Sequence, residues 1–81
     1  MTTTTASLKA ALAIVTTAER EETEEYATTS DLDIALIVRE QLTIDGENWD
    51  SWADQFGKEF TAAYQRVLRA TDAELNAAVS A

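Results

Sequence analysis

Residues 49–67, WDSWADQFGKEFTAAYQRV, carry the most regular helical pattern in this chain of 81 residues. Apolar side chains recur there at steps of three and four, the spacing that gathers side chains on one face of an α-helix. The pattern predicts a helix over residues 49–70, with Asn48 as its N-cap. We expect both tryptophans in the core, with Trp49 the more exposed because it opens the helix. The stripe consists of Trp49, Trp52, Ala53, Phe56, Phe60, Ala63, Tyr64 and Val67.

Gly57 lies on the edge of this stripe. A glycine there permits another helix to approach closely, because it has no side chain. The alternative is a tolerated glycine inside the helix, which costs about 1 kcal/mol relative to alanine. Both interpretations are open from the sequence.

A first helix is predicted over approximately residues 6–28. Apolar side chains from Leu8 to Ala18 fall on one side of it, so this helix is amphipathic. Residues 1–5 precede it as a threonine-rich end, which we expect to be flexible.

A second helix is predicted over approximately residues 31–43. Ser30 and Asp33 have the spacing of a shortened capping box at its start. Apolar residues surround most of its circumference, so we expect it to be the most enclosed element. The run IALIV at residues 34–38 is also typical of a buried β-strand. A helix is favoured because a single strand without a partner makes no stable sheet.

A last helix is predicted over approximately residues 72–80. It follows a full capping box, TDAE, at residues 71–74. Proline is absent and the chain has two glycines, a composition that favours long helices joined by short turns. The predicted fold is all-α: a compact small bundle of about four helices in one domain, residues 1–81.

The residue inventory argues against an enzyme. The sequence contains neither cysteine nor histidine, which removes thiolate ligands and the usual general base near neutral pH. A calcium loop centred on Gly46 fails, because Gln41, Thr43 and Trp52 occupy positions that must supply carboxylates. We predict no catalytic residue, no metal site and no cofactor. No segment approaches the ~20 apolar residues of a membrane span, and we expect a soluble cytoplasmic protein.

Negative charge is concentrated in the middle of the chain. The net charge is −9, and the segment from Glu19 to Asp54 holds twelve acidic residues against two basic ones. Such a field repels nucleic acids and anionic membranes and attracts basic protein surfaces, an effect that salt weakens. The predicted partner is therefore a basic protein surface, and direct binding to nucleic acid or to a membrane is not expected.

The densest charge lies in residues 19–26, EREETEEY. In a continuous first helix Glu19 and Glu22 fall on the same side as the apolar stripe. Neighbouring glutamates on a helix repel one another at a cost of a few tenths of a kcal/mol per pair. Negative charge late in a helix also opposes the helix dipole, which adds about 0.3 to 1 kcal/mol at low salt. Alternatively, Thr16 caps a new helix whose favourable first turns hold the same glutamates. Continuity is preferred because no glycine or proline marks a bend, and in both cases we expect the carboxylates to be solvated.

The cluster is either a solubilising helix face or a recognition surface for lysines and arginines. The second hypothesis explains why charges are placed at a cost to local stability, since a partner neutralises them. The predicted function is that of a small acidic, non-enzymatic inhibitor that docks on a basic, nucleic-acid-binding surface of a larger protein. The candidate partner-binding residues are Glu19, Glu21, Glu22, Glu24 and Glu25 with Tyr26 as an aromatic anchor, and a second patch of Asp45, Glu47 and Asp50 with Trp49 as its anchor.

In short length and acidity the chain resembles the small acidic anti-CRISPR proteins and other phage-encoded inhibitors. The resemblance concerns overall character and transfers no residue, because these proteins share no common motif. It implies an RNA-guided effector complex or another nucleic-acid-handling protein as the partner. Inhibition would occur by occlusion of a basic groove, in the cytoplasm of the host cell.

Two alternative functions are open. One is a structural or adaptor subunit that self-associates as a homodimer through an apolar face. The other is a carrier, because Asp50, Ser51 and Trp52 resemble the Asp-Ser-Leu motif of the acyl carrier proteins, in which the serine holds the prosthetic group. In this chain tryptophan replaces the leucine, and only 30 residues follow Ser51, fewer than that family has.

Overall fold

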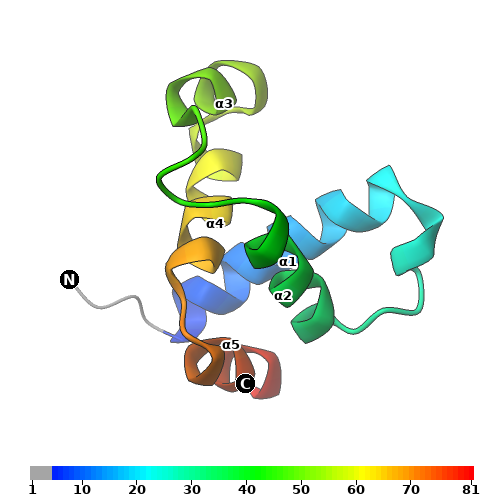
Figure 1. The fold of residues 1–81 in the computed structure, drawn as a ribbon. Helices are drawn as coiled ribbons and strands as arrows, with labels where there is room; N and C mark the ends of the chain where they lie inside the picture. The colour runs from blue at the N-terminus through cyan, green and yellow to red at the C-terminus, as the bar shows by residue number, and fades with distance from the viewer. Residues whose placement is uncertain (1–4) are drawn as a thin grey trace.

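The structure is a computed structural model that describes residues 5–81 (Figure 1). Over these residues the chain is helical without a β-strand, so the predicted all-α class is confirmed and the alternative strand at residues 34–38 is wrong. Residues 1–4 of the expected flexible end lie outside the described part, and Thr5 already belongs to a helix. The elements are α1 (Thr5–Glu22), η1 (Glu24–Tyr26), α2 (Asp31–Gln41), α3 (Trp49–Phe56), α4 (Lys58–Arg69) and α5 (Asp72–Ser80).

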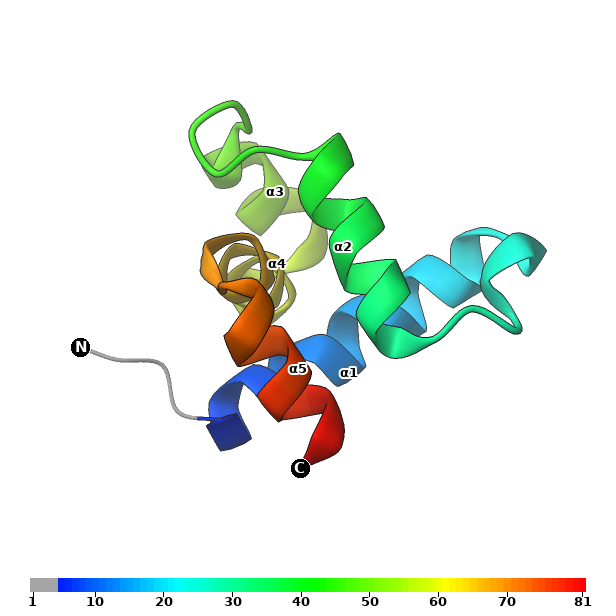
Figure 2. The same cartoon turned by 60° about the horizontal axis from the view of Figure 1, so that its bottom comes forward.

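α1 is the central element of the fold. It packs most extensively against α4 and next against α5, and α2 covers a further part of its length. The helices α3 and α5 lie at opposite ends of α4, as Figures 1 and 2 show. The described chain measures 35 × 32 × 19 Å along its principal axes.

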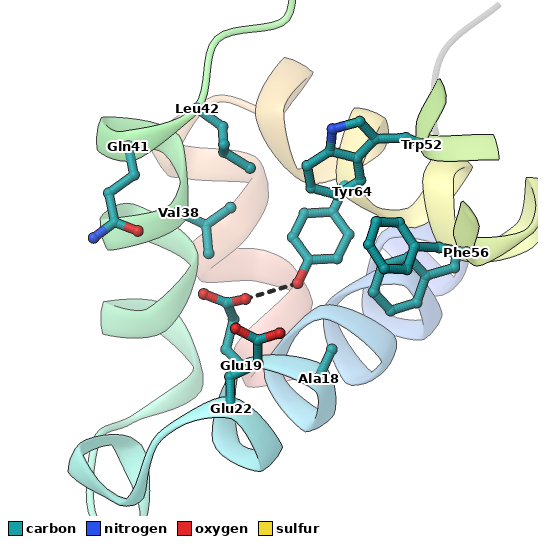
Figure 3. Close-up of a pocket in the computed structure, with 10 residues that line it drawn as sticks. Ala18, Glu19, Glu22, Val38, Gln41, Leu42, Trp52, Phe56 and Tyr64 are labelled. Carbon is teal, nitrogen blue, oxygen red and sulfur yellow. Dashed lines mark hydrogen bonds between the residues drawn. The ribbon is translucent and has the colours of Figure 1, made fainter. Parts of the chain in front are cut away.

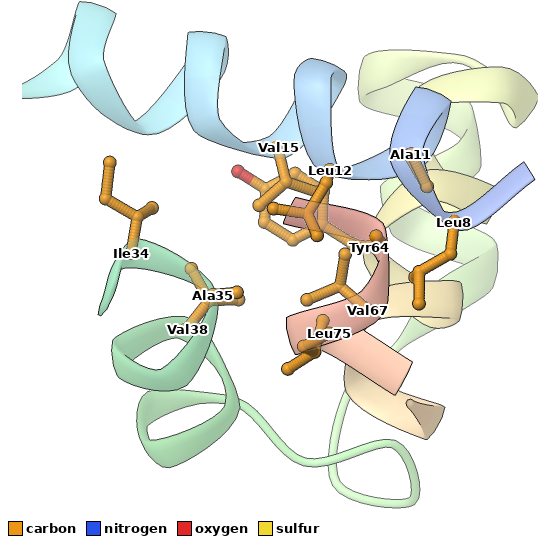
Figure 4. Close-up of a cluster of buried hydrophobic side chains, with 12 residues drawn as sticks. Leu8, Ala11, Leu12, Val15, Ile34, Ala35, Val38, Tyr64, Val67 and Leu75 are labelled. Carbon is orange, nitrogen blue, oxygen red and sulfur yellow. The ribbon is translucent and has the colours of Figure 1, made fainter. Parts of the chain in front are cut away.

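The core lies where α1, α2, α4 and α5 meet (Figure 4). Aliphatic side chains dominate it, and each fully buried leucine, isoleucine or valine stabilises the fold by about 1.5–3 kcal/mol. α2 contributes three buried residues and keeps its other apolar side chains half-buried, so the expectation that it is the most enclosed element is wrong. The buried apolar residues are Leu8, Ala11, Leu12, Val15, Ile34, Ala35, Val38, Ala63, Tyr64, Val67, Leu75 and Ala78.

Gly57 divides the helix predicted over residues 49–70 into α3 and α4. Its φ of 91° and ψ of 159° belong to a region that only glycine ordinarily adopts. The Gly57 N–H donates to the carbonyl of Ala53 at 2.9 Å, and its own carbonyl accepts from the N–H of Thr61 at 3.1 Å. Neither interpretation of Gly57 as a helix-interior residue is right, and no atom beyond its two chain neighbours lies within 4 Å of where its Cβ would be. The chain therefore has five α-helices over residues 5–81 where about four were predicted.

This division carries the α3 part of the stripe away from the core, whereas Ala63, Tyr64 and Val67 of α4 stay in it. α3 has no buried residue, and Phe56 is 51% exposed. Trp49 and Trp52 are half-buried and pack against the core from outside. The prediction that both tryptophans are core residues is therefore wrong, although the stripe itself is helical as predicted.

The predicted helix caps are confirmed. The side chains of Ser30, Asn48 and Thr71 accept hydrogen bonds from backbone N–H groups in the first turns of α2, α3 and α5. Thr71 and Glu74 form the complete capping box. α2 ends at Gln41, two residues earlier than predicted, because the next residue is extended (φ −116°, ψ 152°). No helix within residues 5–81 has both the length and the apolar character needed to cross a membrane.

Candidate functional site

α1 continues through Thr16 without a bend. The hydroxyl of Thr16 donates a hydrogen bond to the backbone carbonyl of Leu12 at 2.9 Å, which is a helix-interior contact and not an N-cap. The alternative of a new helix at Thr16 is therefore wrong. The predicted end of this helix at residue 28 is also wrong, because α1 ends at Glu22.

The chain breaks at Thr23, in the middle of the glutamate cluster. Thr23 is extended (φ −147°, ψ 137°), and its side chain accepts a hydrogen bond from the N–H of Glu25. Glu24 and Glu25 consequently lie in the first turn of η1, where free N–H groups favour negative charge. The break also shortens the run of carboxylates at the negative end of the α1 dipole. The electrostatic conflict predicted from the sequence is thus relieved, at a different threonine.

Arg20 fixes the segment that follows α1. Its Nε donates to the carbonyl of Tyr26 at 3.2 Å, and its Nη2 donates to the carbonyl of Thr29 at 2.8 Å and to Oδ1 of Asp31 at 2.7 Å. These bonds hold the loop that leads into α2. This role of Arg20 was not predicted from the sequence, although Arg20 is the one basic residue inside the glutamate cluster.

Glu19 is attached to the core. Its Oε2 accepts a hydrogen bond from the hydroxyl of Tyr64 at 2.8 Å, and Glu19 is half-buried. Burial raises the pKa of the Tyr64 hydroxyl well above its usual range, and the hydrogen bond to Glu19 and the charges of Glu19 and Glu22 raise it further. The hydroxyl is therefore protonated at neutral pH and holds the carboxylate in place. The expectation that every carboxylate of the cluster is solvated is wrong for Glu19.

Glu19 and Glu22 belong to the wall of a cleft of about 260 Å³. Figure 3 shows the two carboxylates side by side on α1, close to the hydroxyl of Tyr64 and to the aromatic rings. No lysine or arginine within residues 5–81 lines this cleft. Its other lining residues are Ala18, Val38, Gln41, Leu42, Trp52, Phe56, Phe60 and Tyr64.

Four rings of the cleft contact one another in a closed circuit, which we call the aromatic circuit. The ring centroids are 5.5 Å apart for Trp52 and Phe56, and 5.3 Å apart for Phe56 and Phe60. They are 5.0 Å apart for Phe60 and Tyr64, and 5.1 Å apart for Tyr64 and Trp52. The rings are tilted or edge-to-face, as aromatic quadrupoles favour. Because Phe56 is half-exposed, the circuit presents apolar surface to solvent.

A second hollow of about 430 Å³ adjoins the cleft and shares Ala18 and Phe60 with it. It is mostly apolar and follows one side of α1. Its other lining residues are Ala13, Ile14, Thr17 and Glu21. The cleft therefore combines apolar side chains with two glutamates of the cluster, and the second hollow combines them with one.

Exposed carboxylates of the cluster have no ionic partner among residues 5–81. The salt bridges there join Arg20 to Asp31 at 2.7 Å and Arg39 to Asp72 at 2.6 Å. Arg20, the nearest cation in the sequence, is thus engaged with the loop before α2. We call the exposed set the acidic end; its members are Glu21, Glu22, Glu24 and Glu25.

The second predicted patch lies apart from the acidic end. α2 extends between them, with η1 before its start and the loop at residues 42–48 after its end (Figure 2). Asp45 and Asp50 are exposed and Glu47 is half-exposed. The Nε1 of Trp49 donates to the carbonyl of Ile44 at 2.7 Å. This hydrogen bond links the start of α3 to the loop at residues 42–48. The structure therefore does not join the two patches into one surface.

The remaining candidates have structural contacts. Tyr26 is half-buried and packs against the core. Ser51, the serine of the carrier-like motif, is half-buried; its N–H donates to Oδ1 of Asn48 at 3.1 Å, and its hydroxyl accepts from the amide of Gln55 at 3.5 Å. No three acidic side chains of residues 5–81 are grouped so that they would hold a metal ion. Modification of Ser51 stays a prediction.

Comparison with protein-family models, with curated proteins and with solved structures finds no match to this chain. Its function is therefore inferred from the geometry and charge of the site itself.

Proposed function

We propose that this protein is a non-enzymatic inhibitor that docks its acidic end onto a basic surface of a larger protein. The observation that carries this proposal is the set of exposed carboxylates without cationic partners, within residues 5–81, at the end of α1 and in η1. A lysine or arginine of a partner neutralises such carboxylates, steers the encounter and fixes its orientation.

The distribution of basic residues supports an oriented encounter. Lys9 lies near the start of α1, and Arg66 and Arg69 line a small hollow together with Leu8. Lys9 and Glu22 are separated by about 20 Å along the helix, at about 1.5 Å per residue. The field of the protein therefore has a direction along α1, with the negative pole at the acidic end.

A surface that normally binds nucleic acid suits this acidic end, because such surfaces are rich in lysine and arginine. Carboxylates three or four residues apart on a helix are about 5–6 Å from each other, whereas phosphates follow at about 3.4 Å of axis along a DNA strand. The acidic end thus imitates a nucleic acid coarsely. The proposed partner is an RNA-guided effector complex or another nucleic-acid-handling protein in the host cytoplasm, as the resemblance to anti-CRISPR proteins implies.

Competition with nucleic acid tests this proposal. The purified protein is titrated into a panel of RNA-guided nucleases bound to fluorescently labelled target DNA, and displacement of the DNA is followed by anisotropy. We expect displacement that weakens as salt is added, because exposed charges are screened. Absence of displacement from every member of the panel contradicts the proposal.

A matched pair of variants separates a defined docking site from net charge alone. Each variant reverses three exposed carboxylates, so both change the net charge equally. We expect the variant at the acidic end to lose displacement and the control to keep it; equal losses contradict a defined site. The test variant carries Glu21→Lys, Glu24→Lys and Glu25→Lys, and the control carries Glu40→Lys, Asp54→Lys and Glu59→Lys.

A second candidate function is self-association of a structural or adaptor subunit. Phe56 is 51% exposed, and the aromatic circuit and the second hollow form an apolar face that a second copy would cover. Light scattering after size exclusion at several salt concentrations distinguishes the two functions. A dimer held by apolar contacts persists at high salt, whereas docking to a basic partner weakens.

A further inference from the structure

We propose that the cleft beside the aromatic circuit binds an arginine side chain supplied by the partner. This inference rests on the proposed function. The acidic end attracts the partner at longer range, and the cleft provides the contact that makes docking specific. Its occupant follows from the size, charge and ring surface of the cleft.

The size of the cleft favours one long side chain. Its volume of about 260 Å³ is below the ~300–1,000 Å³ that is typical of small-molecule and cofactor sites. The lining is mostly apolar, which suits the aliphatic stem of arginine. A single side chain that enters from a partner surface therefore fits better than a free cofactor.

The charge of the cleft favours a cation. Tyr64 occupies Oε2 of Glu19, which leaves the other oxygen of Glu19 and the carboxylate of Glu22 for a ligand. Both carboxylates lie beside the cleft in Figure 3, and no basic side chain of residues 5–81 lines it. Because the hydroxyl of Tyr64 already holds Glu19, this half of the site is organised before a ligand arrives.

The rings favour arginine over lysine. A guanidinium group stacks on aromatic faces and presents five donors in a planar fork, which matches two neighbouring carboxylates. Trp52 and Phe56 supply ring surface at the cleft, and Phe56 is half-exposed and thus accessible. The ammonium group of lysine is a compact, strongly hydrated charge and makes less use of such rings.

A second copy of the chain is a poor occupant on electrostatic grounds. The two adjoining hollows are lined by Glu19, Glu21 and Glu22, so two copies that meet through this face bring like charges together. Like charges across an interface disfavour association. A basic segment from another protein gains from the same carboxylates.

Peptide binding to the full-length protein tests the inference. The probe is a capped peptide with one central arginine among alanines and serines, compared with peptides that carry lysine or the neutral isostere citrulline at that position. Binding is followed by ¹H–¹⁵N NMR at the indole N–H of Trp52 and the backbone N–H groups of residues 18–22. We expect saturable shifts and an affinity for the arginine peptide about tenfold or more above that for citrulline. Equal binding of citrulline, or no response at these resonances, overturns the inference.

Three single substitutions at exposed residues, one of them a control, locate the bound cation. Glu22→Gln removes a carboxylate of the cleft and is expected to weaken arginine binding about tenfold. Glu40→Gln is the matched control, because it makes the same charge change at an exposed residue outside both the acidic end and the cleft lining. Phe56→Leu removes one ring and is expected to reduce the preference for arginine over lysine. Equal losses in Glu22→Gln and Glu40→Gln overturn the inference.

Failure of the cleft and failure of the proposed function give different results. If displacement of nucleic acid depends on Glu21, Glu24 and Glu25 but is unchanged by Glu22→Gln and Phe56→Leu, the cleft inference is overturned and docking stands. If the arginine peptide binds while no nucleic acid is displaced, the cleft site stands and the inhibitor proposal fails. Shifts at the same resonances that depend on protein concentration, together with a doubled mass, identify a second copy as the occupant and overturn the arginine site.

Discussion

The two ends of α4 are packed in different ways. Toward its C-terminal end, Val67 and the neighbouring Leu75 of α5 are both 0% exposed. Toward its N-terminal end, Phe60 is half-buried and Phe56, just before α4, is 51% exposed. Aliphatic side chains and the ring of Tyr64 thus fill the space where four helices meet, while Trp52, Phe56 and Phe60 border an open cleft. Side-chain size and hydrophobicity alone therefore do not predict which residues form the core. The change of backbone direction at Gly57 separates α3, which has no buried residue, from α4.

Truncation of a side chain at each end of α4 is the strongest test of this difference. Leu75→Ala is expected to lower the free energy of unfolding by about 2–5 kcal/mol, because it leaves a cavity in the core. Phe56→Ala is expected to cost about 1 kcal/mol, because much of that ring is already in water. Urea unfolding followed by circular dichroism measures both. A cost for Phe56→Ala as large as that for Leu75→Ala would mean that the aromatic circuit is a second core.

Gly57→Ala tests the origin of the difference. Alanine at a φ of 91° is expected to cost about 1–3 kcal/mol, because this conformation is strained for a residue with a Cβ. No atom lies near the added Cβ, so the cost comes from the backbone alone. Gly57 is the one residue with positive φ in residues 5–81, so Gly46→Ala is the control for glycine replacement without a positive φ. It is made in a Thr43→Ala background and compared with Thr43→Ala alone, because an added Cβ at Gly46 would collide with Oγ1 of Thr43. An unchanged or increased stability for Gly57→Ala would show that a continuous helix is accessible.

Gly57 also shows where sequence reasoning about the fold ends. Phe56 and Phe60 are four residues apart on either side of it, so the helical pattern runs through the break without a change of phase. The caps at Ser30 and Thr71 were predicted correctly because each hydrogen bond joins residues three apart. Glycine permits a positive φ, but only tertiary packing requires one. A local sequence pattern contains no information about tertiary packing.

The candidate site, like the fold, was predictable only in part from the sequence. Helical phase placed Glu19 on the core side of α1, but its partner Tyr64 is 45 residues away in the chain, so the hydrogen bond had no local signal. The bonds of Arg20 depend on a loop conformation that forms only after the break at Thr23. The cleft is made by four helices and the residue after α2, and its volume depends on how they pack.

Tyr64→Phe tests the bond that connects the core to the cleft. Near neutral pH the substitution is expected to cost about 1 kcal/mol, the usual net value of a hydrogen bond. Because the folded state raises the pKa of Tyr64, its contribution is fully present below the ordinary tyrosine pKa of about 10 and is lost as the pH rises further. The difference in unfolding free energy between the wild type and Tyr64→Phe should therefore shrink above that pH. Urea titrations at neutral and alkaline pH measure it, and a constant difference contradicts the assignment.

The smallest expected effect is the difference in stability between removing charge before Thr23 and removing charge after it in the glutamate cluster. Glu21→Gln/Glu22→Gln removes two charges from the last turn of α1, where the dipole opposes them, and Glu24→Gln/Glu25→Gln removes two from the first turn of η1, where it favours them. Both variants change the net charge equally, so the relief of general repulsion is similar. The first variant should therefore be more stable than the second by about 0.5–1 kcal/mol at low salt.

Urea unfolding at low salt and in 1 M salt measures this gap in stability. The gap should be present at low salt and lost in 1 M salt, where the Debye length falls to about 3 Å. A gap that persists in high salt would assign the difference to side-chain packing, and a gap of opposite sign would mean that the break at Thr23 does not relieve the charge of the cluster.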